Sequence, residues 1–207
     1  MNNEREYRNM PFELRSDDGG EPSFLIEGYA STFEPYKLIE IDGVDYNERI
    51  EPNAFDNADL SDVVYRIDHE GKVYARTSAG TVKLDIDERG LHQITDLSKT
   101  AAGREHFEEI KAGNYPQMSF AFTVDEDHFD ANTNTRIIDR IAKVFDISAV
   151  GFPANPTTEL HVRDYFNGAI EAVKAAEAER QKAAEEWRSD QRARAELKKT
   201  IQGVITK

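Results

Sequence analysis

The sequence predicts an α+β fold, in which a β-dominated domain with few helices is followed by a long helical arm. Up to about residue 160, short β-rich runs alternate with turn residues. One stretch, 100–113, has the pattern of a helix. From about Asp164 to Gln202 the chain is rich in Ala, Glu, Lys, Arg and Gln, which favour helix. We therefore expect a flexible N-terminal segment at 1–22, a domain at 23–163 and an arm at 164–207.

The predicted strands begin with Phe24 to Phe33 and with Asp62 to Asp68, which contains the apolar run Val63-Val64-Tyr65-Arg66-Ile67. Two further runs, Thr81 to Ile86 and Leu91 to Leu97, flank Asp87-Glu88-Arg89-Gly90. Because glycine accepts a positive φ at little cost, this loop predicts a hairpin. The last strands are Gln117 to Val124 and Arg136 to Val150, with a solvated hairpin tip predicted between them at 125–135.

One helix interrupts the strands. Thr100 can cap its N-terminus, Phe107 and Ile110 share a face, and Gly113 can end it.

The arm has few large apolar residues, and they are too sparse for a sustained heptad seam. They are Ile170, Val173, Trp187, Leu197 and Ile201. The segment 167–207 has a net charge of +2, which leaves −16 for residues 1–166. This helix is therefore predicted to be an arm that buries little by itself.

Composition excludes several function classes. The net charge of −14 and the pI of about 4.8 repel phosphate groups, so nucleic acid and membrane surfaces are not expected partners. Without cysteines, thiolate nucleophiles and Cys-based zinc sites are excluded. The charged N-terminus and the lack of a long apolar run predict a soluble protein that stays in the cytoplasm.

Metal binding is not predicted either. Asp130-Ala-Asn-Thr-Asn134 imitates the start of a calcium loop, but Thr135 replaces the required glycine and Ile141 the bidentate glutamate. The remaining histidines show no zinc spacing. They are His92, His106, His128 and His161.

Ser119 is the candidate nucleophile. In a strand Tyr115 to Val124, alternate residues from Met118 onward face the core, and Ser119 lies on the opposite face of small or polar groups. We expect an accessible hydroxyl on a rigid element. The alternative is a serine that merely fits the pleat.

His69 and Asp146 are the candidate partners of that hydroxyl. His69 ends an apolar run, at a strand rim that suits a general base, although a surface histidine is the alternative. Asp146 lies in a mostly apolar strand, where an imidazole N–H would offset the cost of desolvation. The alternatives for Asp146 are a salt bridge with Arg140 or Lys143, or an outward-facing edge position. Together the three side chains match the nucleophile, base and orienting acid of a hydrolase triad.

The order of several motifs over roughly residues 24 to 160 resembles the phage prohead protease family, distant relatives of herpesvirus assemblin. The motifs are Gly28-Tyr-Ala-Ser-Thr-Phe33, Tyr46-Asn-Glu-Arg-Ile-Glu-Pro-Asn-Ala-Phe55, His69, Arg76-Thr77, Gly90-Leu91, Thr100 to Gly113, Met118-Ser-Phe-Ala-Phe122 and Asp146-Ile-Ser-Ala-Val-Gly-Phe-Pro-Ala-Asn155. The last two resemble the serine strand of the family and its segment with an acidic residue.

The resemblance implies that His69 is the base, Ser119 the nucleophile and Asp146 the third member of the triad. Relatives often carry Glu at the position of Asp146, which leaves Asp68 and Glu70 as alternatives for orienting the imidazole.

The chain also departs from the family at Asn53, where glycine is usual, but Asn tolerates the left-handed conformation. Candidates for oxyanion stabilisation are the backbone N–H groups at 149–151 and the side chain of Arg136.

For the fold, the resemblance implies a closed, mainly antiparallel β-barrel wrapped by a few helices. The implied activity is a serine endopeptidase that cleaves the scaffolding segment of the major capsid protein and finally digests itself, without a metal or organic cofactor. The implied location is the immature procapsid in the cytoplasm of a bacterial host. The capsid protein and a second copy of the chain in a homodimer are the expected partners.

Two other function classes compete with this one. In a non-enzymatic capsid or scaffolding component, Ser119 would be a small strand residue and the charged helix would carry the function. A general housekeeping peptidase of the host would instead degrade unrelated unfolded proteins.

Overall fold

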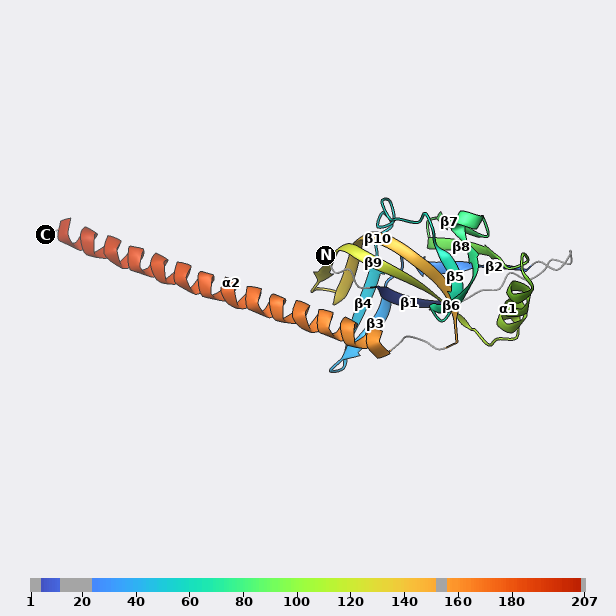
Figure 1. Cartoon of the computed structure of the whole chain (residues 1–207). Coiled ribbons are helices and arrows are strands. Elements are labelled where there is room, and N and C mark those ends of the chain that lie inside the picture. Colours follow the sequence, from blue (N-terminus) through green and yellow to red (C-terminus); the bar gives the residue numbers. More distant parts are fainter. Residues whose placement is uncertain (1–4, 12–23, 152–155, 206–207) are drawn as a thin grey trace. The chain divides into compact units, whose positions relative to one another are not determined.

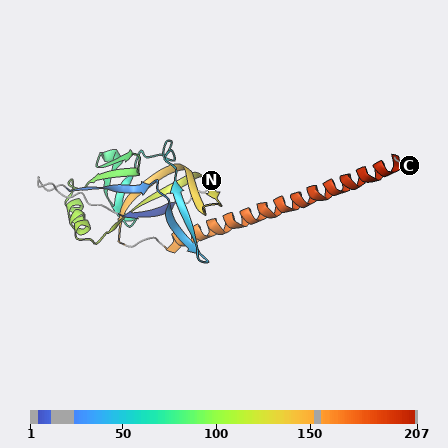
Figure 2. The same ribbon diagram turned by 180° about the vertical axis from the view of Figure 1, so that it is seen from behind.

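The computed structural model describes residues 5–11, 24–151 and 156–205. The chain divides into two compact units, Met1–Arg163 and Asp164–Lys207. Figures 1 and 2 show the strands from two sides. The elements are β1 Glu6–Pro11, β2 Leu25–Thr32, β3 Tyr36–Ile41, β4 Val44–Ile50, β5 Val64–Ile67, β6 Glu70–Arg76, the 3₁₀ turn η1 Thr77–Ala79, β7 Val82–Ile86, β8 Gly90–Asp96, α1 Ala101–Lys111, β9 Gln117–Asp130, β10 Thr135–Val150 and α2 Pro156–Ile205.

The larger sheet is built around the long hairpin of β9 and β10. Its strand order is β1-β9-β10-β4-β3, and β5 also pairs with β10 and with β6. The first half of β10 pairs in parallel with β4, and its last residues pair in parallel with β5. Because β10 spans 16 residues, one edge of it serves two different strands.

The smaller sheet contains three antiparallel strands in the order β2-β8-β7. Gly90 begins β8 at a point where the backbone of β2 passes very closely. A Cβ atom at this position would lie 2.1 Å from the carbonyl oxygen of Ser31, so only glycine fits. This explains why the predicted hairpin loop ends in glycine.

The predicted closed barrel is wrong. The described strands form two open sheets, and the larger one is mixed, with β10 in parallel pairs on the edge opposite β9. Two α-helices are present in the described ranges, in place of a few helices around a barrel. Alternating hydrophobicity indicates a strand but does not reveal its partner or its direction, so closure could not be derived from it.

The predicted strands at 24–33, 62–68, 81–86, 91–97, 117–124 and 136–150 are confirmed by β2, β5, β7, β8, β9 and β10. The predicted hairpin between β7 and β8 is also confirmed. Thr100 caps α1 as predicted, because its hydroxyl accepts a 2.9 Å hydrogen bond from the N–H of Gly103. The tip between β9 and β10 is shorter than predicted, since both strands continue to Asp130 and Thr135.

The hydrophobic core lies where both sheets and α1 meet. Its largest fully buried apolar side chains include Tyr65, Phe120, Phe122, Leu91 and Ile141. Because the first half of β9 and most of β10 supply residues to this core, these parts form a rigid base for any side chain on their opposite face.

Candidate active site

Ser119 lies near the start of β9, between two neighbouring strands. It is paired with Ser148 of β10 on one side and with Asn9 of β1 on the other. Met118 and Phe120, on either side of it in the chain, are fully buried in the core, as the alternation predicted. The expected accessible hydroxyl is not found, however, because Ser119 is also fully buried. Both faces of β9 are covered at this point.

His69 lies in the tight turn that joins β5 to β6. Ile67 pairs with Glu70, so Asp68 and His69 are the two central residues of the hairpin. Both have positive φ, 46° and 61°, as a type I′ turn requires. The carbonyl of His69 accepts a 3.1 Å hydrogen bond from the Arg66 guanidinium. The turn thus holds the imidazole at a fixed place, with 15% of the side chain exposed.

Asp146 is buried in β10, where β9 and β5 flank it. Its Oδ1 lies 2.6 Å from Nδ1 of His69 and accepts a 2.9 Å hydrogen bond from the hydroxyl of Ser148. These two donors satisfy a carboxylate that burial would otherwise destabilise.

The three predicted side chains therefore lie together. Nε2 of His69 is 2.7 Å from Oγ of Ser119, and Nδ1 of the same ring is 2.6 Å from Asp146. Since an ionised carboxylate can only accept, Nδ1 carries the ring proton and Nε2 accepts the Ser119 hydroxyl proton. This is the arrangement that nucleophilic catalysis by a serine requires, with a base next to the hydroxyl and an acid that orients the base.

Comparison with protein families agrees with this geometry. A family model described as caudovirus prohead serine protease matches residues 10–172. The chain belongs to this family. No curated protein and no solved structure gave a significant match. The resemblance inferred from the sequence motifs is thus confirmed, and membership identifies the chain as a serine peptidase of capsid maturation, which implies a place inside the procapsid.

Two residues beside the candidate triad of this protease were not predicted. Ser148 accepts a 3.2 Å hydrogen bond from the backbone N–H of His69 and donates to Asp146, so it ties the turn to β10. Its position two residues after Asp146 puts both on one face of the strand, which could have revealed it. Tyr7 packs edge-on against the His69 ring, with centroids 4.5 Å apart, and no local pattern indicates this contact.

The alternative partners of Asp146 and His69 are engaged elsewhere. Arg140 pairs with Asp125 and Lys143 with Asp59. The carboxylate of Asp68 accepts a 3.1 Å hydrogen bond from the N–H of Gly151. Glu70 is exposed. The geometry therefore favours Asp146 over both alternatives for orienting the imidazole of the protease.

Among the candidates for oxyanion stabilisation, Arg136 and the N–H of Gly151 have other partners in this structure. Arg136 is buried among Glu6, Glu48 and Asp127, at the end of β10 opposite Asp146. The N–H of Gly151 donates to Asp68, as described above. Arg136 is therefore not placed to stabilise charge beside Ser119.

The described part of the chain offers neither a metal site nor a membrane span. Within 5–11, 24–151 and 156–205, no group of three or more His, Asp or Glu side chains is arranged to hold a metal ion. The carboxylate of Asp130 accepts hydrogen bonds from Asn132 and Thr133 and so closes its own turn. His161 lies outside the residues whose side chains are described. None of the helices in these ranges is both long and apolar enough to cross a membrane.

Proposed function

We propose that this chain is a serine endopeptidase that cleaves the scaffolding segment of the major capsid protein, with Ser119 as nucleophile, His69 as general base and Asp146 as the orienting acid. The proposal is supported above all by the continuous line of contacts from Ser119 through His69 to Asp146, at 2.7 and 2.6 Å. Membership in a prohead serine protease family supports the class of substrate.

In the proposed reaction, Oγ of Ser119 attacks the carbonyl carbon of a peptide bond while Nε2 of His69 takes the hydroxyl proton. The C–N bond then breaks, and the imidazolium returns the proton to the departing amine. A water molecule, deprotonated by the same nitrogen, cleaves the acyl-enzyme ester and releases a carboxylic acid product and free Ser119. Asp146 stabilises the imidazolium formed in each half-reaction.

The wider setting belongs to the same proposal. Residues 23–163 carry catalysis, and the arm at 164–207 directs the protein into the assembling procapsid in the bacterial cytoplasm. A homodimer is the proposed assembly, and the protease finally digests itself. Sedimentation analysis of the purified Ser119→Ala variant tests the homodimer without interference from self-cleavage.

The catalytic assignment is tested by co-expression with the capsid protein, followed by intact-mass analysis. We expect the wild type to shorten the capsid protein. Ser119→Ala and His69→Ala should leave it at full length, since loss of a nucleophile or base costs on the order of 10⁴-fold or more in rate.

Matched controls are Ser78→Ala and His128→Ala, which change an exposed serine and an exposed histidine, each hydrogen-bonded to an aspartate. Both should process the capsid protein at the wild-type rate. Equal processing by Ser119→Ala and Ser78→Ala would exclude Ser119 as the nucleophile and favour a non-enzymatic role in assembly.

A further inference from the structure

The N-terminal strand β1 lies directly beside the triad. It runs antiparallel along β9, with Asn9 opposite Ser119 and Tyr7 opposite Ala121. The ring of Tyr7 contacts the ring of His69 at 4.5 Å. Ser119 is fully buried in this arrangement. A peptide bond cannot reach a nucleophile that no solvent reaches, so some covering part must move before hydrolysis.

The edge of β9 that β1 occupies is suited to an extended peptide. Such a peptide adds to a sheet by backbone hydrogen bonds at a strand edge. The other edge of β9 is filled by β10, where Ser148 lies opposite Ser119. A strand in the place of β1 brings its backbone next to Oγ, since opposed Cα atoms of antiparallel strands lie about 4.5 to 5.5 Å apart.

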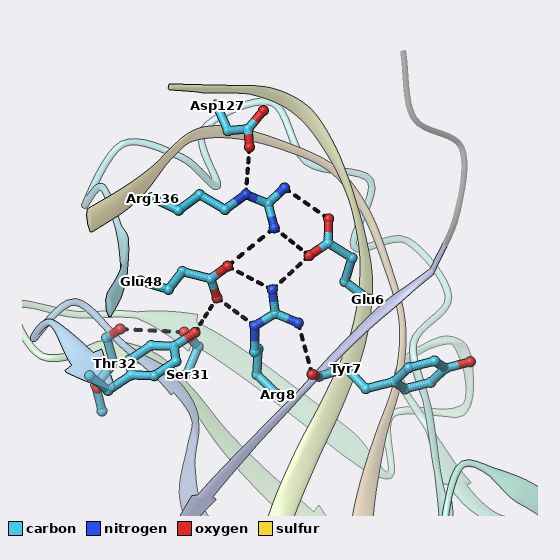
Figure 3. A network of polar contacts seen from close by, with 9 residues as sticks. Glu6, Tyr7, Arg8, Ser31, Thr32, Glu48, Asp127 and Arg136 are labelled. Atoms are coloured by element: carbon cyan, nitrogen blue, oxygen red, sulfur yellow. Dashed lines mark hydrogen bonds and ion pairs between the residues drawn. The ribbon is translucent and has the colours of Figure 1, made fainter. Parts of the chain in front are cut away.

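Besides its pairing with β9, strand β1 is held in place by charges on its other face. Figure 3 shows Arg8 paired with both carboxylate oxygens of Glu48, at 2.5 and 2.6 Å, and with Glu6 at 2.6 Å. Glu6 in turn binds the guanidinium of Arg136 at 2.6 and 2.9 Å. Two ionic contacts, Arg8 with Glu48 and Glu6 with Arg136, thus fix β1 to β4 and β10.

The part of this network outside β1 stays paired if β1 leaves. Glu48 keeps Arg136 at 3.2 Å and the hydroxyl of Tyr36, while Arg136 keeps Glu48 and also Asp127 at 2.5 Å. Departure of β1 removes one positive and one negative charge together, and these two also pair with each other. No buried charge of this network is left without a partner, so the usual large penalty for breaking such a network does not apply.

We propose that the edge of β9 between Gln117 and Phe122 is the docking edge for the substrate peptide, and that β1 occupies it in the resting protein as a latch that must open before cleavage. This inference rests on the proposed role of Ser119. It adds that the substrate binds the edge of β9 as an extended peptide strand. It also adds that β1 of the same chain competes with the substrate for this edge.

The test is a reversible lock on β1. Positions 11 and 117 face each other across β1 and β9, and the double variant Pro11→Cys with Gln117→Cys places a cysteine at each. Because the protein has no cysteines of its own, these two are the only ones in the chain that can form a disulfide. Lys83→Cys with Ile94→Cys, which joins β7 to β8 in the other sheet, is the matched control. Each variant is incubated with a fluorophosphonate, oxidised or reduced, and phosphonylation of Ser119 is followed by intact mass. Ser119→Ala gives the background.

We expect the oxidised 11–117 pair to react at least about tenfold more slowly than its reduced form, because the rate follows the open fraction. The control pair should react equally in both forms. In the unlocked chain, Arg8→Ala should react faster than wild type, whereas Arg140→Ala, which removes an exposed arginine, should not.

The outcomes separate the two proposals. Equal labelling of the oxidised and reduced 11–117 pair would overturn the latch and leave the nucleophile assignment intact. Absence of labelling in every variant, combined with absence of capsid processing, would overturn the proposed function and the latch with it. Slower labelling of the oxidised control pair as well would show a general loss of motion and would also overturn the specific role of β1.

Discussion

At the scale of single residues, the backbone conformation of His69 is the most specific feature of the site. A φ of 61° is uncommon for a residue with a side chain, although histidine is among those that tolerate it best. The two-residue turn enforces this conformation, and the contacts of the ring with Asp146 and of the backbone with Ser148 hold it. The position of the imidazole is therefore set by the turn as much as by the triad.

The role of Asp146 can be measured by Asp146→Asn. The amide preserves size but cannot hold the imidazole in the required tautomer or stabilise its charged form, so we expect kcat to fall by about 10³- to 10⁴-fold with little change in KM. The matched control is Asp139→Asn, since Asp139 contacts His128 at the same 2.6 Å in an exposed pair. The measurement is the initial rate of cleavage of a capsid-derived peptide. Similar rates for Asp146→Asn and Asp139→Asn would show that Asp146 has no role in the mechanism.

A second histidine predicts a pH effect on stability. Burial lowers the pKa of His106 below its ordinary value of 6.5, partly opposed by Glu109, within a cage of Tyr65, Tyr74 and Tyr115. Because the pKa of His106 is lower in the folded protein than in the unfolded protein, its contribution to the free energy of unfolding is fully present above pH 6.5 and is lost as pH falls below that value. Urea unfolding at pH 7.5 and 5.5 should show a larger loss for wild type than for His106→Phe. Equal losses would contradict this.

The sequence located the three candidate side chains but not their surroundings. Ser119, His69 and Asp146 lie in runs whose alternation or ends are visible locally, and the family motifs single them out. Tyr7 reaches His69 only because β1 pairs with β9, and no local pattern encodes a pairing between such distant segments. The burial of Ser119 was missed for the same reason.

At the scale of elements, four strands were missed: β1, β3, β4 and β6. In β1 the usual alternation is inverted, since the charged Glu6 and Arg8 face inward and pair with charged groups of other strands. In β4, Glu48 is fully buried in the same network. Hydrophobic periodicity cannot find a strand whose inward face is ionic.

This network predicts that β1 detaches in acid. Burial alone would raise the pKa of Glu6, but Arg8 and Arg136 outweigh it and lower the pKa to about 2 from 4.5. Such a shift corresponds to about 3 kcal/mol, present above pH 4.5 and lost as pH falls toward 2. Hydrogen exchange of 6–11 should therefore accelerate, relative to the intrinsic rate, between these pH values.

The matched variants separate Glu6 from general acid unfolding. Glu6→Gln removes the titrating group and should show weak protection of β1 at every pH, whereas Glu40→Gln, an exposed site, should behave as wild type. If β1 of the wild type were still protected from hydrogen exchange to the same extent at pH 2, the predicted detachment in acid would be wrong.

At the scale of the whole molecule, the closed barrel was the largest error of the sequence-based prediction. The six predicted strands are confirmed, but β10 pairs in parallel with β4 and β5 along one edge, and the larger sheet is open and mixed. Parallel pairing requires long connections, and the chain between paired strands carries no signal of the final direction. The helical content of the C-terminal segment, in contrast, followed directly from composition.

The proposed role of the C-terminal arm is tested by deleting 167–207. The helix is polar and exposes its single tryptophan, Trp187, at 65%, so we expect it to act through partners outside this chain. The deletion should lower the number of protease copies in purified procapsids, counted by quantitative mass spectrometry. Cleavage of free substrate should be retained. An unchanged number of protease copies per procapsid would show that the arm has no role in encapsidation.

The parallel pairing of β5 with β10 also has a consequence for biosynthesis. Ser119 and Asp146 belong to one hairpin, whose local contacts form early, whereas His69 is 77 positions from Asp146 and docks only when β5 adds to the end of β10. During translation His69 leaves the ribosome first, and Asp146 follows much later. A chain in which β9 and β10 have paired but β5 has not docked thus has the Ser119 hydroxyl without the imidazole beside it, so on the proposed mechanism activity begins only when β5 is in place.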